Sequence, residues 1–550
     1  MSRERIFLFD TTLRDGAQTQ GVDFSVEDKR LIANTLDRMG VDYVEGGWPG
    51  ANPTDTAFFA DAPRLERATF TAFGMTRRSG RSVANDPGLA GLIEAATPAI
   101  CIVGKTWDFH VHVALEIALD ENVEIIADSI RHIAAAGREP LFDCEHFFDG
   151  YKANPDYALA CARAAHEAGA RWVVLCDTNG GTLPHEIERI VGEVARVIPG
   201  SHLGIHAHND TENAVANSLA AVRAGVRQVQ GTLNGLGERC GNANLASLIP
   251  SLMLKPGFAE RFETGISDEG LRQLTSTSRL LDEILNRAPN RHAAYVGAAA
   301  FAHKGGLHVS AVEKDPRTYE HIPPETVGNQ RHVLVSDQAG RSNILSRLRD
   351  LGIEVEPGDP KVGRLLETVK DREFQGYSYD GAEASFELMA RRALGRLPEY
   401  FAVDSFKVMV ERRLNANREL VTVSEAIVKV TVDGERLMSV GEGNGPVNAL
   451  DAALRKDLGK YSSYIADIEL VDFKVRILTL GASGQQQYGT GAVTRVMIES
   501  ADRSGNRWFT VGVSPNIVDA SFQALYDSII YKLMRAGAPA GGAVPSDMAG

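Results

Sequence analysis

The sequence predicts an α/β protein whose N-terminal half is a (β/α)₈ barrel, also called a TIM barrel. From the start of the chain to about residue 250, short apolar runs alternate with longer segments of helical period. Continuous apolar strands that alternate with helices indicate a parallel sheet buried on both faces. Eight such units in about 250 residues fit a closed barrel. A doubly wound open sheet is the alternative fold.

The expected strands are short and mostly apolar. They are Ile6–Asp10, Val41–Gly47, Thr69–Gly74, Ala99–Gly104, Pro140–Glu145, Trp172–Asp177, Leu203–His208 and Val226–Thr232. Amphipathic segments fall between them, at Val26–Met39, Asn122–Ala136, Tyr157–Ala168 and Pro184–Val197. A helical apolar period is what helices packed around a barrel require. We therefore expect the barrel to occupy residues 4–270.

Helical pattern dominates residues 271–404. Helices are expected at Leu271–Asn286, Lys361–Phe374 and Ala382–Leu394, with a Gly/His-rich loop at His303–His308. Because the barrel does not need this segment, we expect a helical linker subdomain that reaches over a neighbouring site.

Residues 405–535 contain an internal repeat. The stretch from Val440 to Leu454 can be laid on that from Val511 to Leu525 at a constant offset, and each copy follows β-rich sequence and enters a helix. Two βββα-like units predict a C-terminal α+β domain that pairs with itself or binds a small molecule. The Ala/Gly/Pro-rich segment 536–550 is expected to be disordered.

Composition narrows the classes of partner. The net charge of −14 argues against nucleic acid or an anionic membrane as the main partner. Five cysteines without a CxxC pair indicate free thiols in a reducing compartment. No apolar run approaches the roughly 18 residues of a membrane span, and the run at the N-terminus is too short for a signal peptide. We expect a cytoplasmic protein.

The strongest chemical motif is His206-Ala207-His208-Asn209-Asp210, at the end of the seventh expected strand. Alternate strand residues point to one face, so His206 and His208 can converge on one ion. Imidazoles are good ligands for Zn, Mn or Fe, and barrel active sites lie at the C-terminal ends of the strands. The alternative is a pair of polar residues that cap a strand.

A second motif, Asp10–Gly16, follows the first expected strand. Asp15 could complete an Asp/His/His metal site, and Arg14 offers a fixed cation for a carboxylate or a developing alkoxide. An ordinary surface Arg–Asp pair is the alternative.

Two glycine motifs are rejected as nucleotide sites. In Asn234–Asn244 the third glycine comes one residue too late for a dinucleotide fingerprint, although such a loop can still cradle an anion. Gly104-Lys105-Thr106 imitates the end of a P-loop, but Ala99 stands where its first glycine belongs.

These motifs together resemble those of a known family. Asp10–Gly16, the His206–Asp210 run and Gly237–Ala243 resemble signature segments of the 2-isopropylmalate, homocitrate and citramalate synthase family. Residues 405–535 resemble its allosteric and dimerisation domain, so the similarity covers nearly the whole chain. The segment Val44–Pro53 departs from the form usual in isopropylmalate synthases and resembles the citramalate-forming branch.

The resemblance implies a set of site residues. One divalent metal ion (Mn, Mg or Zn) would be bound by Asp15, His206, His208 and Asn242. Arg14 would hold the substrate keto oxygen, and Thr178 would meet the carboxylate. Three further residues are implied at the active site, with a structural ion pair, a loop histidine and a packing aromatic as the respective alternatives: Glu145, His308 and Tyr319.

The implied activity is that of an acyltransferase, a Claisen-type condensation of acetyl-CoA with a 2-oxo acid. Pyruvate is the expected acceptor, which would make citramalate the product of a first step toward isoleucine, and 2-oxoisovalerate or 2-oxoglutarate are the alternatives. Glu145 or His308 would be the base. Trp48, Trp107 or Phe147 could fill the pocket that selects pyruvate. A homodimer with isoleucine feedback is implied by the C-terminal domain.

Two other function classes remain open at this point. Lyases and aldolases with similar barrel motifs typically lack the regulatory domain. A catalytically inactive metabolite sensor would have lost site residues, and none of the expected ones is missing.

Overall fold

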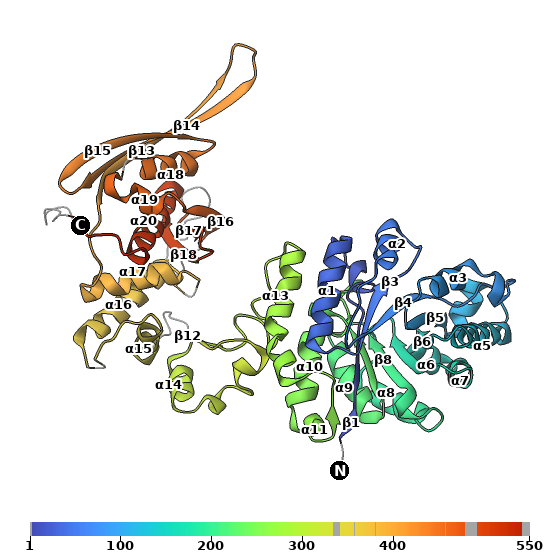
Figure 1. Ribbon diagram of the computed structural model, residues 1–550. Helices are drawn as coiled ribbons and strands as arrows, with labels where there is room; N and C mark the ends of the chain where they lie inside the picture. The colour runs from blue at the N-terminus through green and yellow to red at the C-terminus, as the bar shows by residue number, and fades with distance from the viewer. Residues whose placement is uncertain are drawn as a thin grey trace. The chain divides into compact units, whose positions relative to one another are not determined.

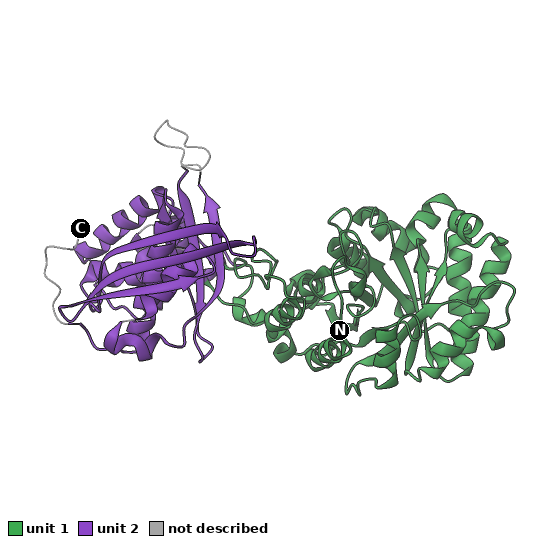
Figure 2. Cartoon of the chain, turned by 90° about the horizontal axis from the view of Figure 1, so that it is seen from above, with its two compact units in different colours: residues 1–301, 321–331 green, residues 302–320, 332–550 purple. Residues whose placement is uncertain are grey.

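The computed structural model describes residues 3–333, 341–356, 358–379, 381–456, 458–478 and 492–541. The chain forms two compact units (Figure 2). Unit 1 comprises residues 1–301 and 321–331, and unit 2 comprises residues 302–320 and 332–550. The expected domain boundaries at 270 and 404 do not coincide with the edges of these units, and they stay predictions.

Unit 1 contains a closed barrel of eight strands, which confirms the predicted fold and rules out the open sheet. The strands are β2 (Phe7–Asp10), β3 (Tyr43–Gly47), β4 (Thr69–Met75), β5 (Ala99–Lys105), β6 (Glu139–Glu145), β7 (Trp172–Asp177), β8 (Leu203–Ala207) and β9 (Gln228–Gly231). Each pairs in parallel with its neighbours, and β2 closes the barrel on β9 with Leu8 opposite Val229.

Helices lie around the outside of these strands (Figure 1). They include α1 (Val26–Met39), α2 (Pro53–Ala60), α3 (Pro87–Glu94), α5 (Leu119–Ala135), α6 (Phe147–Ala153), α7 (Pro155–Glu167), α8 (Pro184–Val194), α9 (Ala214–Ala224) and α10 (Leu245–Leu254). Local sequence sets the bounds of α1. Ser25 and Asp28 form a capping box at its start, and Gly40 ends it with a φ of 99°.

The barrel interior changes from apolar to polar along the strands. Phe9, Tyr43, Leu141 and Trp172 belong to one buried cluster inside the barrel. Because every second residue of a strand faces the same side, the inward positions further along the strands lie at the carboxyl end. Those positions carry acidic and amide side chains, namely Glu45, Asp143, Glu145 and Gln230.

Further elements pack on the barrel. A short strand β1 (Glu4–Arg5) pairs with β10 (Phe262–Glu263). The helix expected at Leu271–Asn286 is two helices, α12 (Asp268–Arg272) and α13 (Leu274–Ile284). Leu271, Leu274 and Leu281 join the same hydrophobic core as the barrel helices.

Unit 2 begins with the segment that the sequence suggested to be a loop. That expectation is wrong from Gly306 onward, where helix α14 (Gly306–Lys314) starts. The reason is tertiary: Val309 and Val312 are buried and anchor the helix despite the preceding glycines. The other elements before the sheets are β11 (Ala302–His303), β12 (His332–Val333), α15 (Arg341–Asp350), α16 (Pro360–Phe374) and α17 (Glu383–Leu394).

The rest of unit 2 confirms the two βββα units. The first is β13 (Ala402–Leu414), β14 (Leu420–Val432), β15 (Glu435–Gly443) and α18 (Pro446–Lys456). The second is β16 (Glu469–Ile477), β17 (Thr494–Ala501), β18 (Arg507–Ser514) and α20 (Ile517–Arg535).

The repeat extends to individual contacts. Ser439 Oγ donates to the carbonyl of Ala453 at 2.6 Å, and Thr510 Oγ1 donates to that of Ala524 at 2.8 Å. These bonds occupy equivalent positions in the two copies, and each ties the third strand of a unit to its helix.

The last described residues are packed. Tyr461 Oη donates to Pro539 O at 3.0 Å, and the Gly541 amide donates to Glu399 O at 2.7 Å. Residues 536–541 of the expected disordered segment are therefore ordered, and 542–550 lie outside the described residues. Within the described ranges, no helix combines the length and apolar character that crossing a membrane requires.

Candidate active site and metal centre

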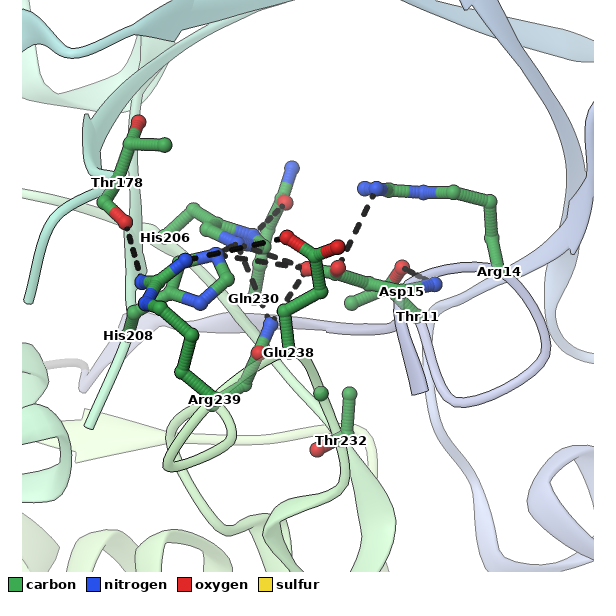
Figure 3. A network of polar contacts seen from close by, with 12 residues as sticks. Thr11, Arg14, Asp15, Thr178, His206, His208, Gln230, Thr232, Glu238 and Arg239 are labelled. Atoms are coloured by element: carbon green, nitrogen blue, oxygen red, sulfur yellow. Dashed lines mark hydrogen bonds and ion pairs between the residues drawn. The ribbon is translucent and has the colours of Figure 1, made fainter. Parts of the chain in front are cut away.

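Asp15, His206 and His208 converge at the carboxyl end of the barrel (Figure 3). Asp15 follows β2, and the histidines lie at the end of β8 and directly after it. Asp15 Oδ2 lies 3.2 Å from His206 Nε2 and 3.8 Å from His208 Nε2, and the two Nε2 atoms are 3.3 Å apart. All three residues are buried. The predicted convergence is confirmed, and a carboxylate with two imidazoles fits a divalent metal ion.

Asn242 joins this cluster. An isolated antiparallel bridge places it opposite His208. Its Nδ2 lies 2.7 Å from Asp15 Oδ2 and 3.3 Å from His206 Nε2, while its Oδ1 is buried without a hydrogen-bond partner among the described residues. A half-turn of the amide would direct that oxygen at the other ligand atoms. The donor set therefore fits a cation with Asn242 as a fourth ligand.

The Gly-rich loop after β9 makes room for Asn242. Gly237 has a φ of 152°, and a Cβ there would collide with the Asn242 amide. The absence of a side chain at Gly237 thus leaves the space that the Asn242 amide occupies.

The protonation states of Asp15 and His208 suit metal binding. Burial by itself would raise the pKa of Asp15, but Arg14 and the two histidines hold it well below its usual range. Burial, then the charge of His206, lowers the pKa of His208 to about 4. At neutral pH this gives a carboxylate and a neutral imidazole, which are the forms that bind metals.

A second layer of side chains orients His206. Its Nδ1 lies 2.8 Å from Gln230 Oε1, and Gln230 Nε2 donates to Asp143 Oδ1 at 3.1 Å. Burial and then Glu45 raise the pKa of Asp143 to about 6. Sequence reasoning missed Gln230 and Asp143, although polar residues at inward positions of apolar strands were a usable signal.

Arg14 is held rigidly beside the cluster. Its Nε donates to Glu45 Oε2 at 2.8 Å, and its guanidinium lies 3.9 Å from the centroid of the Phe73 ring. Its Nη1 is 3.6 Å from Asp15 Oδ1. Glu45 is fully buried and also accepts from Thr11, and sequence reasoning missed its role. Arg14 is therefore a preorganised cation next to the metal cluster.

Glu145 ends β6, and Thr178 directly follows the neighbouring strand β7, at the same mouth. The Thr178 hydroxyl accepts from the His146 amide at 2.8 Å, and its carbonyl accepts from Arg239 Nη2 at 2.8 Å. Glu145 forms an ion pair with Lys105, so the structural alternative for Glu145 describes a real contact. The substrate roles of Glu145 and Thr178 stay predictions.

Comparison with known proteins identifies the family. Residues 5–278 match the HMGL-like family, 295–375 match the homocitrate synthase post-HMGL domain-like family, and 380–533 match the LeuA allosteric (dimerisation) domain. An (R)-citramalate synthase of Geobacter sulfurreducens is 52% identical over 96% of this chain and 97% of that protein. One from Aquifex aeolicus is 49% identical over 97% and 98%. The chain belongs to the (R)-citramalate synthase family.

A relative from another branch of the family is less similar. A probable 2-isopropylmalate synthase of Methanopyrus kandleri is 33% identical over 95% of this chain and 97% of that protein. The prediction of the citramalate-forming branch, which depended mainly on Val44–Pro53, is therefore confirmed.

His308 and Tyr319, the linker residues implied by the resemblance, belong to unit 2. Their rings stack with centroids 4.1 Å apart, and Tyr319 is 45% exposed. Next to them, His303 Nε2 and Glu320 Oε1 form a buried pair at 3.1 Å. The placement of His308 and Tyr319 over the barrel mouth stays a prediction.

A cavity of ≈ 510 Å³ lies beside Arg14. It distinguishes Trp48 from Trp107 and Phe147, the three aromatic residues expected as candidates to fill the acceptor pocket. Trp48 and Phe73 line it and pack edge to face, with centroids 5.8 Å apart. Phe147 is fully buried in the core, and Trp107 stacks on His110. Of the three, Trp48 is the one that lines this cavity with Arg14.

Proposed function

We propose that the protein condenses acetyl-CoA with pyruvate and releases (R)-citramalate and CoA. The observation that carries the proposal is the Asp15/His206/His208 cluster beside a fixed Arg14, in a chain whose full-length relatives are (R)-citramalate synthases. Acceptance of 2-oxoisovalerate or 2-oxoglutarate is the alternative.

A single divalent ion, Mn, Mg or Zn, would be held by Asp15, His206, His208 and Oδ1 of Asn242. When bound, it supplies a Lewis acid that polarises the keto group of the 2-oxo acid. Arg14 donates to the keto oxygen from a side chain whose position Glu45 and Phe73 already fix. Thr178 meets the acceptor carboxylate.

The base at the mouth is Glu145, with His308 as the alternative. Glu145 takes a proton from the acetyl-CoA methyl group, and the resulting enolate carbon bonds to the keto carbon of pyruvate. The keto π electrons move to oxygen, where Arg14 stabilises the alkoxide until it is protonated. Water then cleaves the thioester and releases CoA, which makes the sequence effectively irreversible.

The test follows CoA thiol release with pyruvate, 2-oxoisovalerate and 2-oxoglutarate in parallel. We expect a clear preference for pyruvate and loss of turnover on chelation. Preference for either other acid would reject pyruvate and leave the family unchanged. Turnover of none, with an amino-acid response that survives chelation, would indicate a metabolite sensor.

The LeuA allosteric (dimerisation) domain supports a second part of the proposal, a homodimer inhibited by isoleucine. Titration of the intact protein with isoleucine, leucine and valine should show inhibition by isoleucine, and sedimentation should give the mass of a dimer. Equal or absent responses would reject isoleucine as the effector. A cytoplasmic location without nucleic-acid or membrane partners remains a prediction.

A further inference from the structure

The Glu145 carboxylate forms an ion pair with Lys105. Lys105 lies in Gly104-Lys105-Thr106, the segment that only imitates the end of a P-loop. We propose that Lys105 is a positioning residue for Glu145, holding its carboxylate in the orientation that removes the acetyl-CoA proton. The inference rests on the proposed function, in which Glu145 is the base.

The barrel register brings the two side chains together. β5 and β6 are parallel neighbours in which Lys105 lies opposite Glu145. Cys101 and Leu141, four residues earlier in each strand, belong to the interior cluster. Alternation therefore directs Lys105 and Glu145 inward at the mouth, where Lys105 Nζ forms an ion pair with Glu145 Oε2.

The backbone around the ion pair is fixed at both partners. The Thr106 amide and hydroxyl both donate to the Glu145 carbonyl, at 3.2 and 2.8 Å. Asn122 Nδ2 donates to the Lys105 carbonyl at 2.9 Å. Gly104 leaves space for the Phe142 ring, since a Cβ there would lie 2.7 Å from Cε2 of that ring. These contacts fix the backbone of residues 104–106 against the end of β6.

The carboxylate itself depends on Lys105. Among the residues that the structure describes, Lys105 is the ion-pair partner of the Glu145 side chain, and the charge of Glu145 also acts on the nearby His110. Without the ammonium, the Glu145 carboxylate would lose its ion-pair partner. Proton removal from a weak carbon acid needs the base within hydrogen-bond reach, and a misplacement of about 1 Å can cost about 100-fold in rate.

The burial of the pair makes stability a necessary second readout. The side chains of Lys105 and Glu145 are 18% and 24% exposed, so both are largely buried. Removing one partner of a buried ion pair destabilises the fold. The positioning role is therefore judged from kcat of the folded variant, with the thermal midpoint measured beside it.

The experiment compares Lys105→Met, Lys105→Arg, Glu145→Gln and the Lys105→Met/Glu145→Gln double variant. Lys152→Met is the matched control, because Lys152 is an exposed lysine on α6 whose ammonium contacts Thr182. Metal content and thermal midpoint are measured for each, and Lys105→Gln replaces Lys105→Met if the latter does not fold.

We expect Lys105→Met to lower kcat by about 100-fold with little change in the KM for pyruvate. The primary isotope effect with trideuterated acetyl-CoA should rise, because proton removal becomes slower. Lys105→Arg should recover most of kcat, and Lys152→Met should behave as wild type. In the Glu145→Gln background, Lys105→Met should cause no further loss.

The outcomes separate the two proposals. An active wild type with an impaired Glu145→Gln and an unimpaired Lys105→Met rejects the role of Lys105 alone, as does an additive loss in the double variant. Wild-type turnover in Glu145→Gln rejects Glu145 as the base, and the role of Lys105 falls with it. A wild type that forms no citramalate rejects the proposed reaction itself.

Discussion

His206 Nδ1 lies 2.8 Å from Oε1 of Gln230, on the side of the ring opposite the metal cluster. A metal-ligating histidine commonly donates its second ring N–H to such an acceptor, which fixes both tautomer and ring orientation. Because Gln230 is bonded in turn to Asp143, the orientation of His206 depends on a buried chain of three side chains.

Gln230→Met should weaken metal binding by about 10–100-fold, because this substitution keeps the side-chain volume and removes both hydrogen bonds. Chelator competition on the purified protein measures the affinity, and saturating metal should restore most activity. Gln228→Met is the matched control, since Gln228 is also buried and lies two residues earlier on β9. Equal losses in the two variants would contradict a specific role for Gln230.

Arg14→Lys should lower kcat/KM for pyruvate by an amount equivalent to about 2–4 kcal/mol in the transition state. A guanidinium can donate through Nε to Glu45 and still present its Nη atoms to the site, whereas one ammonium cannot do both. Steady-state kinetics at saturating acetyl-CoA measures the loss. Arg77→Lys, at a residue paired with Asp128, should behave as wild type. Near wild-type turnover in Arg14→Lys would remove Arg14 from the mechanism.

Local pattern predicted the barrel and the histidine pair, but with limits that have physical causes. The expected strands began at Val41 and Val226, whereas β3 and β9 begin at Tyr43 and Gln228. Val41 and Val226 are buried, but they precede the hydrogen-bonded part of each strand. An apolar run indicates burial and does not indicate where strand pairing begins. His206 and His208 could be paired because the two-residue period of a strand is local.

Local sequence pattern could not predict which residues support the site. Gln230 is 87 residues from Asp143, and Arg14 is 31 residues from Glu45. Gln230 meets Asp143 only because the barrel closes and places β9 across the interior from β6. Arg14 meets Glu45 because β2 pairs with β3, which the sequence alone does not show. For His308 the local signal pointed the wrong way, since two glycines indicated a loop where buried valines stabilise a helix.

Trp48→Leu should widen the range of acceptors. Trp48 lines the cavity beside Arg14, and a smaller side chain there would leave room for a branched substituent. A difference of one methylene group in an apolar pocket is worth about 10–200-fold in specificity. The ratio of kcat/KM for 2-oxoisovalerate to that for pyruvate should therefore rise by about 10-fold or more. Trp107→Leu is the control, and an equal rise in that variant would contradict the assignment of the pocket to Trp48.

Relative to wild type, the Asp10→Asn variant should become more stable as pH rises. Asp10 is fully buried, and although Thr12 donates to both carboxylate oxygens, burial raises the pKa of Asp10 to about 7. The unfolded value is near 3.9, so the folded chain retains a proton that the unfolded chain loses between about pH 4 and 7. The contribution of Asp10 to the free energy of unfolding is present below pH 4 and is lost as pH rises to 7.

An asparagine cannot ionise, so Asp10→Asn should escape this loss. Its free energy of unfolding relative to wild type should increase by up to about 4 kcal/mol between pH 4 and pH 8. Urea unfolding at four pH values, with metal content held equal, measures the difference. Asp23→Asn, at an exposed position, should show no such trend. A wild type and an Asp10→Asn variant whose difference in stability is independent of pH would show that Asp10 is ionised in the folded protein throughout this range.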